Sequence, residues 1–265
     1  MRMILITVVA VATLLCAASA FAFVLDINDG GLTEWGVTPG TDWNPNSGIY
    51  STIEPQGNDF FLNPGYGGHM YDVEAMYAAT VGDNLYFAVV TGFPIGTTHD
   101  GNRAGDIAFK FGNSTYAYGI ETTGDGGRVK GGLYKVTDWG QGYNYWGSWG
   151  GHSGWYGGVY AGAPTEILTT DATWTPYTDG GLNLNYYNYQ NGNYHYIIEG
   201  YVPKIAFGDA WSHNDTFTMH WTETCGNDFG ELKGVCTPEP ATMSLLGLGL
   251  FGILGFRRKK INGAV

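Results

Sequence analysis

The sequence predicts an all-β protein, built as one antiparallel β-sandwich of jelly-roll type over residues 23–236. The chain has 265 residues, of which 43 are glycine, 15% are aromatic and only 14% are charged. Its 44% apolar fraction supplies the side chains of a folded core, which argues against disorder. Residues 23–236 show no apolar period of 3.6 residues, which argues against a helical bundle. Many short strands with frequent turns are typical of sandwiches and barrels instead.

The clearest predicted strand covers residues 216–222. Phe217, Met219 and Trp221 alternate there with polar residues, which predicts one buried and one solvent-facing side. Residues 106–111 repeat the pattern, and residues 85–91 are apolar on both faces, as in a central strand. Further strands are predicted at 73–79, 116–121, 128–136 and 194–202. Turns rich in Asp and Gly, at 29–31, 82–84, 125–127 and 179–181, separate the strands.

Residues 1–22 have the composition of a secretory signal peptide. A short basic start precedes an apolar run at 4–15, and small residues at positions 18, 20 and 22 form two cleavage sites. We therefore expect these residues to be removed during export. The domain that remains would cover residues 23–236.

The C-terminal residues predict one membrane crossing. Residues 241–256 are 16 consecutive residues without charge, and Arg257, Arg258, Lys259 and Lys260 follow at once. A helix of this length spans about 24 Å, slightly less than the roughly 30 Å of a hydrocarbon core. A buried core helix is the alternative for such a run, but the four cations favour a cytoplasmic end. The expected precursor has an exported domain, one transmembrane helix and a cytoplasmic stub.

Pro238, Glu239 and Pro240 stand directly before this apolar run. Together with the apolar segment and the basic end, they resemble the PEP-CTERM sorting signal over residues 237–260. The resemblance implies processing by an exosortase, a membrane enzyme that cuts near the Pro-Glu-Pro motif, and delivery to the cell surface or extracellular matrix of a bacterium. The two prolines also keep the segment extended and accessible. An ordinary single-pass anchor with a chance Pro-Glu-Pro is the alternative.

A second resemblance concerns the predicted sandwich. The segment from Asp29 to Val37, with its Asp-Gly turn and Trp35, resembles the start of DOMON-like carbohydrate-binding sandwiches. Residues 72–75 and 85–89 resemble the next pair of strands of such modules, and residues 220–228 resemble the last strand of exosortase-dependent surface proteins. The resemblance implies a sandwich fold and suggests a glycan ligand.

The net charge excludes one class of partner. The whole chain carries −12, and without its two basic ends it keeps seven basic against 24 acidic residues, a net charge of −17. Nucleic-acid binding needs clustered Lys and Arg, so we expect no nucleic-acid partner. A neutral glycan or a divalent cation fits an acidic domain better.

A charge-free segment at 139–165 gathers aromatic residues among glycines. Aromatic rings can stack on the apolar faces of sugars, so these residues are candidate contacts for a glycan such as exopolysaccharide. The alternative is that they fill the core or pack on one another. The candidates are Trp139, Tyr143, Tyr145, Trp146, Trp149, Trp155 and Tyr156.

Two oxygen-rich glycine turns are candidate calcium sites, because Ca²⁺ prefers six to eight oxygen ligands. Their candidate ligands are Asp26, Asn28 and Asp29 in one turn, and Asp100, Asn102 and Asp106 in the other. Neither turn matches a complete helix-loop-helix calcium motif, and Asx-turns without metal are the alternative.

Cys225 and Cys236 are the two cysteines that remain after signal removal. In an exported protein they are candidates for a disulfide. Two unbridged cysteines are the alternative, because the Pro-Glu-Pro segment starts just after Cys236 and needs freedom.

The sequence predicts a non-enzymatic protein. The segment 151–155 lacks the second glycine of a nucleophile elbow, and the six histidines show no zinc-binding spacing. The expected function is that of an exported surface or matrix protein that binds exopolysaccharide. A purely structural or adhesive matrix protein is one alternative, and a secreted glycoside-active enzyme is another.

Overall fold

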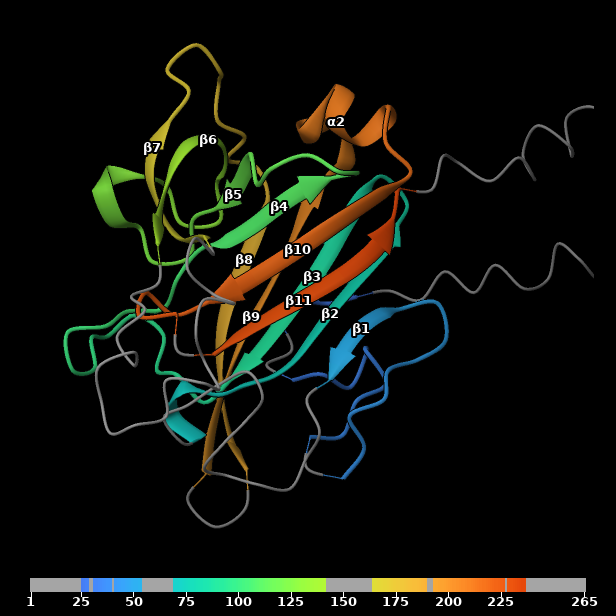
Figure 1. The fold of residues 1–265 in the computed structure, drawn as a ribbon. Coiled ribbons are helices and arrows are strands. Elements are labelled where there is room, and N and C mark those ends of the chain that lie inside the picture. Colours follow the sequence, from blue (N-terminus) through green and yellow to red (C-terminus); the bar gives the residue numbers. More distant parts are fainter. Residues whose placement is uncertain are drawn as a thin grey trace, which may run out of the picture.

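The computed structural model describes residues 25–28, 31–39, 41–53, 69–141, 164–189, 193–226 and 228–236. These residues form two antiparallel sheets whose inner faces share one hydrophobic core (Figure 1). The predicted all-β class is therefore confirmed, with two facing sheets as in a β-sandwich.

The first sheet has five strands in the order β1-β2-β3-β9-β8, and the second has six in the order β11-β10-β4-β5-β6-β7. The strands of the first sheet are β1 (Tyr50–Ile53), β2 (Val73–Val81), β3 (Asn84–Thr91), β8 (Gly181–Tyr189) and β9 (Asn193–Pro203). Those of the second are β4 (Ile107–Phe111), β5 (Tyr118–Ile120), β6 (Leu133–Gln141), β7 (Pro164–Thr170), β10 (Thr216–Thr222) and β11 (Phe229–Val235). The helical elements of the described residues are short: η2 (His69–Tyr71), η3 (Asp125–Gly127), η5 (Lys204–Phe207) and α2 (Asp209–Ser212).

All seven predicted strands are present. The segment at 216–222 is β10, and the segment at 85–91 is β3, which lies between β2 and β9 in the centre of its sheet. The segments at 73–79, 106–111, 116–121 and 194–202 correspond to β2, β4, β5 and β9, whereas the segment at 128–136 overlaps β6 only at residues 133–136. The sequence does not predict β1, β7, β8 or β11.

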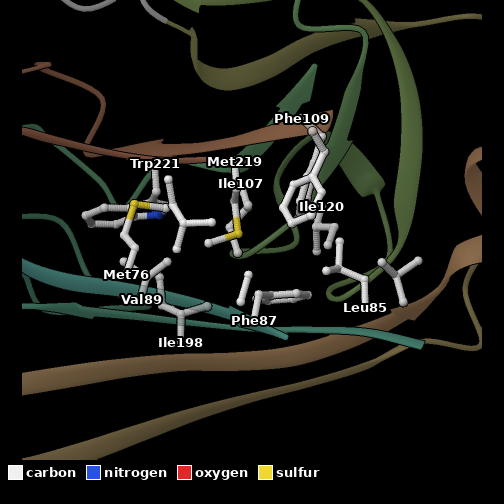
Figure 2. Close-up of a cluster of buried hydrophobic side chains, with 14 of the residues drawn as sticks. Met76, Leu85, Phe87, Val89, Ile107, Phe109, Ile120, Ile198, Met219 and Trp221 are labelled. Atoms are coloured by element: carbon white, nitrogen blue, oxygen red, sulfur yellow. The ribbon is translucent and has the colours of Figure 1, made fainter. Parts of the chain in front are cut away.

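The core lies between the sheets. Phe87 of β3 and Met76 of β2 face Phe109 of β4 and Met219 and Trp221 of β10, and all five side chains are fully buried (Figure 2). Burial of each such side chain contributes about 2 to 3 kcal/mol, so this contact holds the two sheets together.

A further layer covers the outer face of the first sheet. The N-terminal segment before β1 packs Leu32, Trp35 and Trp43 against the outward side chains of β2, β3 and β9. The Trp35 indole N–H donates to Glu199 Oε1 at 2.6 Å, and the Tyr77 hydroxyl donates to the Trp43 carbonyl at 2.8 Å. The described residues that follow the predicted signal peptide are thus part of the fold.

The outer side of β10 is also buried, so the prediction of a half-buried strand is wrong. Thr218 and His220 are 5% and 2% exposed. The His220 ring packs against the rings of Tyr116 and Phe229, and β7, which begins at Pro164, contacts β10. The β6–β7 hairpin therefore covers the side of β10 that the sequence assigns to solvent.

The two ends of the sandwich differ in what they carry. At one end, here called the tail end, β10 begins, β11 finishes, and η5 and α2 lie beside the turn between β2 and β3 (Figure 1). The other end, here called the loop end, gathers the connections at 92–106, 121–132 and 223–228. Hydrogen bonds link these connections, for example from the Thr224 N–H to the Arg103 carbonyl at 2.9 Å.

A buried carboxylate organises the loop end. Glu121 has no exposed surface, and its Oε1 accepts backbone N–H groups of the loop that follows β5, including that of Gly124 at 2.9 Å. Its Oε2 pairs with Arg128 Nε at 2.6 Å. Beside it, Asp106 accepts the N–H groups of Thr122 and Ile167, each at 2.8 Å. Burial, reinforced by the charge of Glu121, raises the pKa of Asp106. These two carboxylates join β4, the β5–β6 loop and β7.

We predict that Glu121→Gln lowers the free energy of unfolding by about 3–5 kcal/mol, because it leaves Arg128 without its buried counter-charge. Urea denaturation at pH 7 measures the change. The matched control is Asp125→Asn, which removes a half-exposed partner of Arg103 at 3.2 Å and is expected to cost less than about 1 kcal/mol. Equal effects of the two variants would contradict the role assigned to Glu121.

We also predict an acid-side loss of stability from His220. Burial lowers the pKa of His220 from 6.5 to about 4. Between these values the unfolded chain binds a proton that the folded protein does not, so the free energy of unfolding falls as the pH is lowered from about 6.5 to 4. This single site accounts for about 3 kcal/mol.

The measurement compares wild type with His220→Phe by urea denaturation at pH 7, 5.5 and 4.5. The variant cannot titrate, so its stability should decline less steeply with acid, whatever its stability at pH 7. The same slope in both proteins would show that His220 is not the group responsible.

Candidate functional site

The last described residue, Cys236, directly follows β11. Cys236 is 4% exposed, belongs to the core, and donates its N–H to the Asp215 carbonyl at 2.9 Å. The predicted Pro-Glu-Pro segment begins two residues later. Its residues Pro238, Glu239 and Pro240, the basic Arg257, Arg258, Lys259 and Lys260, and the predicted helix at 241–256 lie outside the described residues, as does the predicted signal peptide. The predicted processing segment therefore starts directly after the last described residue.

The candidate disulfide between Cys225 and Cys236 is not formed in this structure, in which both residues carry thiols. Cys225 follows the end of β10 at the loop end, whereas Cys236 follows the end of β11 at the tail end. The length of the seven-residue β10–β11 hairpin separates them by about 20 Å, and a disulfide needs Cα atoms within about 7 Å. Burial raises the pKa of the Cys236 thiol to about 11, which keeps it protonated.

The aromatic, charge-free segment forms the connection between β6 and β7. Its flanking residues Gln141 and Pro164 pair across the two strands, and β7 contacts β10. The connection therefore starts and finishes over the outer face of the second sheet. Tyr143, Tyr145, Trp146, Trp149, Trp155 and Tyr156 lie outside the described residues.

Trp139, the one candidate glycan contact within the described residues, takes part in packing. Its ring packs on the small cluster formed by Tyr134, Val136 and Ile167, and its indole N–H donates to the Tyr116 carbonyl at 2.9 Å. This is the packing alternative that the sequence leaves open for these aromatic residues.

The candidate calcium ligands do not converge in the described residues. Asp26 Oδ1 accepts the N–H and the side-chain amide of Asn28, which is an Asx-turn, and Asp29 lies outside the described residues. Asp100 and Gly101, with φ of 49° and 81°, form the tight turn between the paired residues His99 and Asn102.

Asp106 is wrongly assigned to that second calcium turn. Its two carboxylate oxygens each accept a backbone N–H in the buried network with Glu121, so they serve the fold. Within the described ranges, no group of three or more His, Cys, Asp or Glu side chains is placed to hold a metal ion. Calcium binding elsewhere in the domain stays a prediction.

The loop end brings together polar residues that the sequence does not single out. The Tyr71 hydroxyl lies 3.0 Å from His99 Nδ1, and the Arg103 guanidinium pairs with Glu166 and, at 3.2 Å, with Asp125. Burial raises the pKa of Tyr71. The partners come from connections far apart in the chain, so no local motif could reveal them. They form a polar, hydrogen-bonded surface at the end of the sandwich opposite the chain terminus.

Helices play a minor part in what the structure describes, and none of them has the length and apolar character required to cross a membrane. The longest α-helix there, α2, has four residues.

Comparison with known proteins identifies one segment. Residues 237–259 match the family model of the PEP-CTERM protein-sorting motif. The searches of curated proteins and of solved structures each found no match, so the DOMON-like resemblance of the sandwich stays a prediction. The match begins at the residue after Cys236, the last residue of the described fold. The chain therefore ends in the sorting signal of an exported protein that an exosortase processes.

Proposed function

We propose that this protein is a non-enzymatic component of a bacterial cell surface or its extracellular matrix, exported as a membrane-anchored precursor and released by exosortase. The observation that carries the proposal is the match of residues 237–259 to the sorting motif, directly after the buried Cys236. A cut within residues 237–259 leaves every strand of the described fold in the released part.

The proposed topology has three parts. Residues 1–22 direct secretion and are removed, residues 23–236 fold outside the cytoplasm, and residues 241–256 cross the membrane with the basic residues 257–260 on the cytoplasmic side. The charge-free run and the adjacent cations of the sequence support this arrangement.

We further propose that the β6–β7 connection binds exopolysaccharide. Its 22 residues, 142–163, contain no charged residue and include three tryptophans, and paired strands fix both of its ends. Such a connection can present aromatic rings to sugars without repelling or desolvating charges.

The alternative is a purely structural or adhesive matrix protein without a sugar site, which the packing role of Trp139 favours. A glycan titration separates the two functions. Hydrolysis of the same polysaccharide during the titration would instead support a glycoside-active enzyme.

Replacement of Pro238, Glu239 and Pro240 by alanine is expected to leave the precursor in the membrane fraction, because the extended segment that the enzyme cuts is removed. Cell fractionation followed by immunoblotting measures the released share. The matched control is Asn262→Ala, which lies beyond the matched residues 237–259 and should be processed like wild type. Unchanged release of the alanine variant would refute the proposed sorting.

The glycan proposal predicts that a variant with Trp146, Trp149 and Trp155 replaced by alanine binds host exopolysaccharide at least about tenfold more weakly. Retention on immobilised polysaccharide measures the affinity. The control is Trp174→Ala. Trp174 is partly exposed, packs near Tyr118 and lies outside the aromatic segment. Failure of the wild-type protein to bind would favour the purely structural function.

A further inference from the structure

The tail end of the sandwich carries the most exposed large hydrophobic side chain of the described residues. Ile205 of η5 is 84% exposed, and Val235, the last residue of β11, is 38% exposed. Exposure of an isoleucine to this degree costs free energy in water, so the residue is suited to an apolar or interfacial surrounding.

The exposure of Ile205 is imposed by a well-packed element. The N–H of the preceding residue, Lys204, donates to the Asp83 carbonyl at 2.8 Å. Phe207 is buried between Phe109 and Phe111, with ring centroids 5.4 and 5.1 Å away. The hydrogen bond of Lys204 and the packing of Phe207 therefore fix η5, and the side chain of Ile205 between them is exposed to solvent.

The chain leaves the fold at the same end, and its next segment is short. Cys236 is fixed by burial and by its hydrogen bond to Asp215. Only residues 237–240 separate it from the apolar run that starts at Ala241. The five steps from Cys236 to Ala241 span at most about 17 Å when fully extended.

This reach exceeds the thickness of a lipid headgroup layer, which is about 5–8 Å on each side of the hydrocarbon core, by only about 9–12 Å. If Ala241 lies at the edge of that core, Cys236 stands no more than about 12 Å above the headgroups. The domain cannot move away from the membrane before it is cut.

We propose that, in the uncut precursor, the tail end of the sandwich rests on the bilayer, with Ile205 among the lipid headgroups and the loop end turned outward. The inference rests on the proposed membrane crossing by residues 241–256. It names a second partner for the domain, a zwitterionic lipid surface, which the domain loses on release.

The charges at the tail end decide which lipid it meets. The exposed acidic residues at this end are Asp83, Asp209 and Asp215, whereas the basic residues there are Lys204 and Lys233. The small acidic excess disfavours an anionic surface, so zwitterionic phosphatidylcholine is the appropriate probe.

The test places a photoreactive benzophenone amino acid at position 205 or, as a control, at position 129 of the full-length precursor in phosphatidylcholine vesicles. Val129 is 51% exposed, so it matches an accessible hydrophobic position, but it lies in the loop after β5 at the opposite end. After irradiation, mass spectrometry counts lipid adducts. We expect at least about tenfold more adducts at position 205.

A second variant carries 20 Gly and Ser residues inserted between Cys236 and Thr237. Such a linker has an end-to-end distance of about 25 Å, which frees the domain from the surface. Adducts at position 205 should then fall to the level of position 129. If the adducts at position 205 persist in this variant, the short tether is not what causes the contact with lipid.

Flotation of the vesicles separates failure of this inference from failure of the proposed function. A precursor that floats with the vesicles but gives equally few adducts at both positions overturns the lipid contact and leaves the membrane crossing intact. A precursor that does not float overturns the crossing and the contact together.

Discussion

Burial of β10 on both faces is the constraint on which the rest of the structure depends. Six of its seven residues are buried. The inner side chains Phe217, Met219 and Trp221 meet the first sheet in the core, and the outer side chain of His220 lies under the β6–β7 hairpin. The strand thus fixes both sheets and the hairpin at once. Its first residues define the tail end, and the connection after its last residue belongs to the loop end.

Glycine contributes to this packing beyond its place in turns. A Cβ atom at Gly200 of β9 would stand 2.4 Å from the Phe87 ring, and one at Gly234 of β11 would stand 2.4 Å from the Phe217 ring. The large aromatic side chains of the core therefore need glycine on the neighbouring strands. This relation explains part of the joint excess of glycine and aromatic residues, which the composition shows but does not interpret.

The sequence predicts local features well and tertiary ones poorly. The alternation in 216–222 identifies β10 with its bounds, yet not the burial of its polar side, because the covering hairpin starts more than 70 residues earlier. β11 reads FGELKGV, in which glycines replace apolar residues, so no alternation marks it. The cysteines are close in sequence and far apart in the hairpin. The sorting motif, by contrast, is contiguous and needs no tertiary context, and the sequence alone identifies it.

The position of Cys236, a buried residue directly before the matched motif, makes the two functions of the chain modular. All backbone pairing of β11 and the hydrogen bond to Asp215 precede residue 237, where the matched motif begins. The strands of the described fold and the matched motif therefore occupy separate stretches of the sequence. Evolution could therefore exchange the anchor while keeping the domain, or attach the same terminal address to an unrelated domain, without having to repack either part.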